Sequence, residues 1–83
     1  MLNAKFAWLI LNDILSTDEY NLKGIAHYTD TFEEVIEEVM IGQNTNPSAA
    51  LLRRLIDLHR TVRRDLYEAI LKKIATKYLA ANL

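Results

Sequence analysis

The sequence predicts an all-α fold, a compact domain of five helices. Over most of the chain, apolar residues recur three and four positions apart, which is the spacing of one helix face. Glycine and proline together number three among 83 residues, so few positions interrupt a helix. A chain of this length has room for one core, and residues 1–83 are therefore expected to form a single helical domain.

The first predicted helix has Asn3 as its cap and runs to about Leu15. Its centre, the sequence FAWLIL at residues 6–11, is apolar on every side. An apolar run of this length is also compatible with a buried strand, because periodicity alone does not separate the two. No second strand pattern in the chain is available to pair with it, and we therefore favour the helix.

A second and a third helix are predicted between residues 21 and 42. Asn21 has the side chain of a helix cap. The apolar side of the helix after it consists of Leu22, Ile25 and Ala26. Thr31 and Glu34 have the spacing of a capping box at the start of the third helix, and Gly42 is placed to end it in a left-handed conformation. The apolar side of the third helix consists of Val35, Ile36, Val39 and Met40.

Two further helices are predicted at about 47–60 and 64–80, with an interruption at Thr61 or Val62. Pro47 and Ser48 mark the start of the fourth helix. Its buried side is expected to consist of Leu51, Leu52, Leu55, Ile56 and Leu58. The apolar stripe of the fifth helix consists of Leu66, Ile70, Ile74 and Tyr78, with Tyr67 and Leu71 beside it. Small domains are only marginally stable alone, so the residues of this stripe are the candidate contacts of a homodimer.

Charge is divided unevenly along the chain. Residues 1–52 contain two lysines and eight acidic residues, a net charge of −6, whereas residues 53–83 contain eight basic and three acidic residues, a net charge of +5. We therefore expect an electric dipole, which can steer a charged partner or align two copies of the chain. A solvated surface without any partner would show the same division.

Composition also excludes several classes of protein. Without cysteine there is neither a disulfide framework nor a thiolate zinc site, which fits a reducing compartment. The longest apolar run, residues 6–11, is far shorter than the roughly 20 residues that cross a bilayer. Asn12 and Asp13 follow this run at once, unlike the pattern of a signal peptide. A cytoplasmic location without membrane contact is expected.

The stretch NLKGIAHYTDTFEEVIEEVMIGQNTNPSAALLRRLIDLH, residues 21–59, has a characteristic order of caps, apolar positions and helix ends. These positions are Asn21, Ile25, Ala26, Ile36, Val39, Gly42, Pro47, Leu51 and Leu55. In this order the stretch resembles the Cro and phage-repressor type (lambda-repressor-like) of helix-turn-helix domain, without a gap. The resemblance implies that the apolar positions share one interior. It also implies that the helix at 31–42 is a recognition helix for the DNA major groove.

This sequence departs from the family pattern at positions that matter for function. Asp30 stands where the turn usually has glycine, and Leu22 stands where a polar residue often reaches a phosphate. The positions that the resemblance places at base edges carry Glu33, Glu34 and Glu38, with Glu37 adjacent. A single glutamate accepts a hydrogen bond from the cytosine amino group, but four carboxylates oppose the attraction to phosphates.

Two functions from different classes follow. The first is a small transcriptional regulator that binds double-stranded DNA as a homodimer, through the fifth helix or the apolar first helix. Its candidate contacts to the phosphate backbone are Lys23, Gln43, Asn44, Thr45, Asn46, Arg53 and Arg54, with Arg60, Arg63 and Arg64 able to flank the groove. The alternative is a degenerate helix-turn-helix that serves as a protein interaction module. Its acidic helix, with Glu33, Glu34, Glu37 and Glu38, would then bind a basic protein partner or the basic half of another copy.

Catalysis and metal binding have little support in the sequence. His27 lies three residues before Asp30, and His59 lies two residues after Asp57. Neither pair comes with the third ligand or the nucleophile that a metal site or an acyl-transfer site needs. We therefore expect no enzyme activity, no cofactor and no metal, and we interpret both histidines as surface or packing residues.

The aromatic residues are expected to serve the structure. Phe6 and Trp8 on the first helix, and Tyr67 and Tyr78 on the last, are interpreted as core or dimer contacts. Phe32 follows the expected cap of the third helix and is predicted to fasten the turn to the core as a hydrophobic staple. The alternative is that Phe32 is an exposed anchor for a partner.

Overall fold

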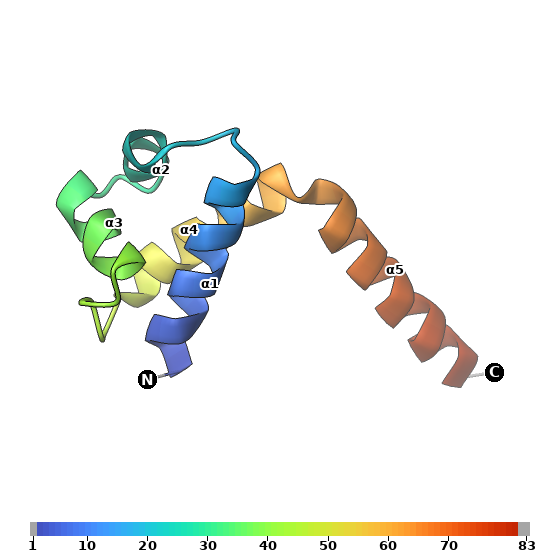
Figure 1. Ribbon diagram of the computed structural model, residues 1–83. Helices are drawn as coiled ribbons and strands as arrows, with labels where there is room; N and C mark the ends of the chain where they lie inside the picture. Colours follow the sequence, from blue (N-terminus) through green and yellow to red (C-terminus); the bar gives the residue numbers. More distant parts are fainter. Residues whose placement is uncertain (1, 82–83) are drawn as a thin grey trace.

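Five α-helices follow one another in the computed structural model, which describes residues 2–81 (Figure 1). They are α1 (Leu2–Ser16), α2 (Leu22–Tyr28), α3 (Glu33–Met40), α4 (Ala49–Val62) and α5 (Arg64–Ala81). No residue within this described range belongs to a strand, so the apolar run at residues 6–11 is helical. The predicted all-α fold is confirmed.

The core lies among the first four helices. α1 packs against α4, α3 packs against α1, and α2 packs against both α3 and α4. The buried apolar side chains are Ala7, Ile10, Leu11, Ile14, Ile25, Ala26, Ile36, Val39, Leu51, Leu55 and Leu58. Full burial of one large aliphatic side chain contributes about 1.5–3 kcal/mol, so this cluster supplies most of the driving force for folding. The apolar positions of α2, α3 and α4 thus share one interior, as expected.

The start of α2 explains a glycine inside a short helix. Asn21 is the N-cap, and its side-chain Oδ1 accepts a hydrogen bond from the Gly24 N–H at 2.8 Å. A Cβ atom at Gly24 would lie 3.3 Å from this Oδ1 and 3.3 Å from a ring carbon of Tyr20. Glycine costs a helix about 1 kcal/mol relative to alanine, and this close approach is the reason it is tolerated here.

The connection between α2 and α3, residues 29–32, is held by hydrogen bonds on both sides. The hydroxyl of Thr29 is fully buried and donates to the carbonyl of Ile25 at 2.8 Å. The Arg54 guanidinium donates to the carbonyl of Thr29 at 3.0 Å, which attaches the connection to α4. Asp30 has a φ of 52°, in the left-handed region that aspartate adopts more readily than most residues. The connection is therefore an ordered part of the fold.

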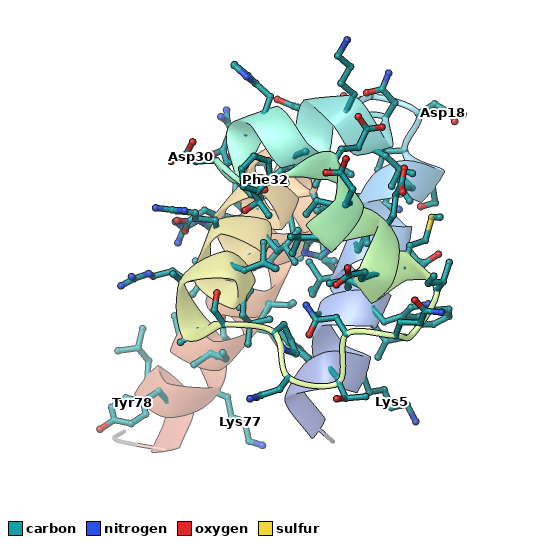
Figure 2. All side chains as sticks on the ribbon, turned by 90° about the vertical axis from the view of Figure 1, so that its left-hand side faces the viewer. Lys5, Asp18, Asp30, Phe32, Lys77 and Tyr78 are labelled. Atoms are coloured by element: carbon teal, nitrogen blue, oxygen red, sulfur yellow. The ribbon has the colours of Figure 1, made fainter. Side chains whose placement is uncertain are left out.

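The start of α3 differs from the prediction. The N-cap is Phe32, not Thr31, and it has no side-chain capping bond. The Thr31 hydroxyl donates instead to the carbonyl of Thr29 at 3.0 Å, and Glu34 is no longer three residues after the cap. Phe32 has extended backbone angles and is 79% exposed (Figure 2). The predictions of a capping box and of a hydrophobic staple are both wrong, because the turn uses the hydroxyl that the capping box needs.

Other boundaries agree to within one or two residues. α1 begins at Leu2, so Asn3 lies inside the helix and is not its cap. Ser48 caps α4 and accepts a hydrogen bond from the Leu51 N–H at 3.0 Å. α4 continues through Val62, and the break falls at Arg63, whose φ of −116° and ψ of 43° leave the helical region. Gly42 follows α3 with a φ of 78°, the left-handed conformation that was predicted.

The last helix leaves the body of the molecule. α5 packs against α4 at its start and then projects away from the other four helices (Figure 1). All described side chains from Glu68 to Leu79 are exposed. The molecule therefore measures 50 × 28 × 19 Å, with the long dimension set by α5, which we call the arm.

Candidate functional site

The outer side of α3 is uniformly acidic. Glu33, Glu34, Glu37 and Glu38, which we call the acidic face, are all exposed. Ile36 and Val39 on the opposite side are buried in the core, and this burial fixes the orientation of the helix. None of the ion pairs among the described residues involves the acidic face. The sequence-based expectation that these carboxylates point to water is confirmed.

The acidic face does not stabilise its own helix. Glu33 and Glu34 lie in the first turn, where the helix dipole favours negative charge. Glu37 and Glu38 lie in the last turn, where the dipole opposes it, and each is four residues from another glutamate. Like charges at this spacing cost about 0.2–0.5 kcal/mol per pair. Local helix stability therefore gives no reason for the second pair of carboxylates.

Apolar side chains stand at both ends of the acidic face. Phe32 precedes it, and Ile41, the C-cap residue, follows it with 59% of its surface exposed. Beside Phe32 is a shallow pocket of about 260 Å³, whose lining residues are Ala26, His27, Asp30, Thr31 and Phe32. The outer side of α3 thus combines four exposed carboxylates with an exposed apolar side chain at each end.

The candidate phosphate contacts come from three parts of the chain. Lys23 is exposed near the start of α2, and Gln43, Thr45 and Asn46 are exposed in the loop after α3. Asn44 is half-buried, and its side-chain oxygen accepts a hydrogen bond from the Asn46 N–H at 3.1 Å. The loop closes onto α3, because the N–H groups of residues 43 and 44 donate to the carbonyl of Glu38 at 2.9 and 3.1 Å.

Most of the arginines belong to other surfaces. Arg54 bonds the connection before α3, Arg60 pairs with Asp57 at 3.0 Å, and Arg63 pairs with Asp13. Arg53 lines a surface pocket of about 690 Å³ along the start of α4. In the view of Figure 2, nitrogen-tipped side chains extend from α4 (yellow) to the side opposite α3 (green). The positive groups of α4 therefore do not form a ring around the acidic face.

A polar cluster that the sequence analysis missed joins α1, α4 and α5. The Nε2 atom of His59 lies 2.7 Å from Asp13 Oδ2, and its Nδ1 lies 2.6 Å from the Tyr67 hydroxyl. Arg63 donates from Nε and Nη2 to the two carboxylate oxygens of Asp13, at 2.9 and 3.0 Å. We call Asp13, His59, Arg63 and Tyr67 the polar junction. It holds the start of α5 against α1 and α4.

The geometry of the polar junction sets the direction of its hydrogen bonds. His59 is 6% exposed, and because a carboxylate only accepts, its Nε2–H donates to Asp13. In the neutral ring Nδ1 then accepts from the Tyr67 hydroxyl. Hydrogen bonds from Arg63 and then from His59 hold the pKa of Asp13 below its ordinary value, and burial raises the pKa of Tyr67. The sequence spaces His59, Arg63 and Tyr67 four residues apart across the break between α4 and α5, which suggests contact among these three but gives no signal for Asp13.

The candidate dimer contacts are all on the arm. Leu66, Ile70, Ile74 and Tyr78 are each about half exposed or more. Of the aromatic residues interpreted as core or dimer contacts, Phe6 and Trp8 are also partly exposed, and Trp8 donates its indole N–H to the carbonyl of Met40 at 2.9 Å. These residues therefore contribute surface rather than core.

Searches of the described residues give two negative results. They contain no group of three or more histidine, aspartate or glutamate side chains arranged to hold a metal ion. Within the same residues, no helix combines the length and the apolar character that a membrane crossing requires. Comparisons of the chain with family models, with curated proteins and with solved structures give no match.

Proposed function

We propose that the chain is a protein-docking domain whose acidic face binds a basic segment of a partner protein. One observation carries the proposal: four exposed carboxylates, which form no ion pair with any described residue, lie on the helix whose N-cap is the exposed Phe32. Carboxylates attract lysine and arginine, and a neighbouring aromatic ring adds apolar area and a cation–π contact. The partner is thus expected to present basic side chains with an apolar residue beside them.

The energetics favour a salt-sensitive complex. Each ion pair between an exposed carboxylate and a lysine or arginine of the partner contributes at most about 1 kcal/mol to binding. Such ion pairs weaken as the salt concentration rises. Burial of Phe32 contributes about 1.5–3 kcal/mol more. A basic partner also neutralises the repulsion between Glu33 and Glu37 and between Glu34 and Glu38. Electrostatics are therefore expected to set the specificity and Phe32 to supply much of the affinity.

Double-stranded DNA is the second candidate, and one arrangement favours it. α2 and α3 are joined by the short ordered connection at 29–32, and the outer side of α3 is open to solvent next to the loop at 43–46. This arrangement is compatible with a helix-turn-helix regulator, which reads base edges with its second helix. The acidic face opposes it, because non-specific DNA affinity comes from neutralised phosphates.

Parallel titrations distinguish the two candidates. Fluorescence anisotropy is measured with a labelled lysine- and arginine-rich peptide containing one leucine, and with a random duplex, at about 50 and about 200 mM salt. The docking proposal expects peptide binding that weakens with salt and no duplex binding. Binding of the duplex but not of the peptide at the lower salt would overturn it in favour of the regulator.

Two variants with equal net charge locate the surface. The first changes Glu33, Glu34, Glu37 and Glu38 to glutamine, and peptide binding is expected to disappear. The second makes the same charge change elsewhere, through Asp18→Asn, Glu19→Gln, Asp65→Asn and Glu68→Gln, and should retain most of the binding. Equal losses in the two variants would mean that net charge alone attracts the peptide, which contradicts a docking site on α3.

A further inference from the structure

α1 and α5 each have an apolar side that starts next to the polar junction and continues away from it along the helix. On α1, Leu9 and Phe6 lie four and seven residues before Asp13, so the three side chains share one side of the helix. On α5, Ile70 and Ile74 lie three and seven residues after Tyr67 and share its side. Asp13 and Tyr67 both contact the ring of His59. The two apolar sides are therefore turned toward each other as α1 and α5 diverge (Figure 1).

These apolar sides remain open to solvent. Phe6 and Leu9 are 43% and 49% exposed, and Ile70 and Ile74 are 46% and 58% exposed. Leu66 and Leu71 extend the α5 side and are also exposed. In proteins most helical stability comes from the packing of an apolar side rather than from helix propensity. Among the described residues, those from Glu68 to Leu79 are all exposed, so the other four helices give this part of α5 little packing.

We propose that a second copy of the chain covers these apolar sides, with each α5 lying between α1 and α5 of the other copy. The exposed area of the apolar residues of the two sides is on the order of 500 Å², taking roughly 150 Å² for one fully exposed large side chain. Adjacent lysine stems and backbone add to it, and a stable interface needs about 800 Å² per partner.

The shape and chemistry of the surface identify a second copy as the occupant. A partner that covers this surface needs a helix of similar length with one apolar side, and α5 itself is such a helix. A two-fold arrangement uses the same surface on both copies and closes after two chains. The stripe at Leu66, Ile70 and Ile74 contains no charge, so it offers nothing to a nucleic acid backbone. The acidic face lies on α3 and stays free for the proposed partner.

The polar junction gives this surface its shape. The bond between Tyr67 and His59 fixes the side of α5 that is turned toward α1, and the ion pair of Arg63 with Asp13 fixes the start of the arm. If the arm direction matters for pairing, Tyr67→Phe should weaken the dimer although it removes no apolar surface. The expected increase in the dissociation constant is about 3- to 10-fold, the fold-change that corresponds to one lost hydrogen bond.

Sedimentation equilibrium of the full chain over a range of concentrations tests the proposal. The wild-type chain is expected to form a dimer and no larger species. Ile74→Glu is expected to raise the dissociation constant by at least about 100-fold, because the interface would enclose an unpaired charge. Ile41→Glu is the matched control, since Ile41 has the same exposure on α3, outside the two apolar sides, and should leave the dimer unchanged.

Leu9→Glu distinguishes the proposed arrangement from a dimer in which only the two α5 helices contact each other. It should weaken the dimer about as strongly as Ile74→Glu, because α1 of one copy contacts α5 of the other. A monomeric wild-type chain at about 100 µM, a series of growing oligomers, or a dimer unaffected by Ile74→Glu would each overturn the proposal. A dimer that tolerates Leu9→Glu would overturn the part assigned to α1. The monomeric Ile74→Glu variant is expected to bind the basic peptide as the wild-type chain does. Failure of the dimer proposal can therefore be told apart from failure of the proposed docking function.

Discussion

α3 and α5 present opposite chemistry to solvent. α3 buries Ile36 and Val39 and shows water its carboxylates, whereas α5 shows water an apolar stripe with Ile70 and Ile74. The difference follows from position, because α3 packs against α1 and α2, whereas α5 packs against α4 at its start and its described residues from Glu68 to Leu79 are exposed. An apolar stripe on a helix therefore predicts a surface that is stabilised by packing against another helix or chain. Whether the partner belongs to the same chain depends on the tertiary structure.

The largest expected effect contrasts two isoleucines that differ only in their surroundings. Ile36→Asp places an unpaired charge in the core and should cost more than about 4 kcal/mol, enough to unfold a small domain. Ile74→Asp should change the folding free energy of the single chain by less than about 0.5 kcal/mol. Far-UV circular dichroism during urea denaturation of dilute protein checks both. A folded Ile36→Asp chain would contradict the core assignment.

A smaller effect concerns the polar junction that joins α5 to the body. The folded-state pKa of Asp13 lies below the value of 3.8 expected in the unfolded chain, so the unfolded chain takes up the proton first on acidification. The stabilisation is therefore complete above about pH 5 and is lost as pH falls through the lower, folded-state pKa. The Asp13 side chain is 39% exposed, which limits the effect to below about 1 kcal/mol.

Urea denaturation at a series of pH values measures this contribution. The wild-type chain should lose more stability between about pH 5 and pH 2 than Asp13→Asn, because asparagine does not titrate. Asp57→Asn is a suitable control, since Asp57 makes an exposed ion pair with Arg60 and should leave the pH profile close to that of the wild type. Parallel profiles for wild type and Asp13→Asn would show that the junction does not stabilise the fold electrostatically.

The smallest effect divides the acidic face itself. Glu37→Gln with Glu38→Gln should raise the free energy of unfolding by about 0.3–1 kcal/mol, because both carboxylates oppose the dipole in the last turn. Glu33→Gln with Glu34→Gln should give a smaller gain or a loss, because the first turn favours negative charge. Thermal unfolding at low salt compares the two double variants. Equal shifts would mean that the carboxylates act only through net charge.

Much of the fold could be predicted from the sequence. Periodicity placed five helices, and the side chains of Asn21 and Ser48 marked two helix starts that the structure confirms. The same rules failed at Thr31, because two hydroxyl-bearing residues in the turn, Thr29 and Thr31, compete for nearby backbone carbonyls. Phe32 then lies one residue outside the helix with its ring in solvent. A shift of one residue thus turned the side chain of a predicted staple out into solvent.

Only part of the candidate site could be predicted from the sequence. The four glutamates could be assigned to the exposed side, because Ile36 and Val39 must face the core. The position of the arginines could not be assigned, since it depends on how α4 crosses the other helices. The polar junction was missed because Asp13 and His59 are 46 positions apart in the sequence. Contacts over such separations are set by packing, and no local pattern records them.

By itself, the sequence determined the local features of this protein: the helices, two of their N-caps, the apolar side of each helix and the charge on the outer side of α3. Those features depend on interactions within a few residues, and helical geometry fixes them. Only the tertiary structure decided that α5 leaves the body, that Phe32 lies in solvent and that His59 bridges Asp13 and Tyr67. Each of these depends on distances between segments far apart in the chain, which are set when the four helices of the core pack together.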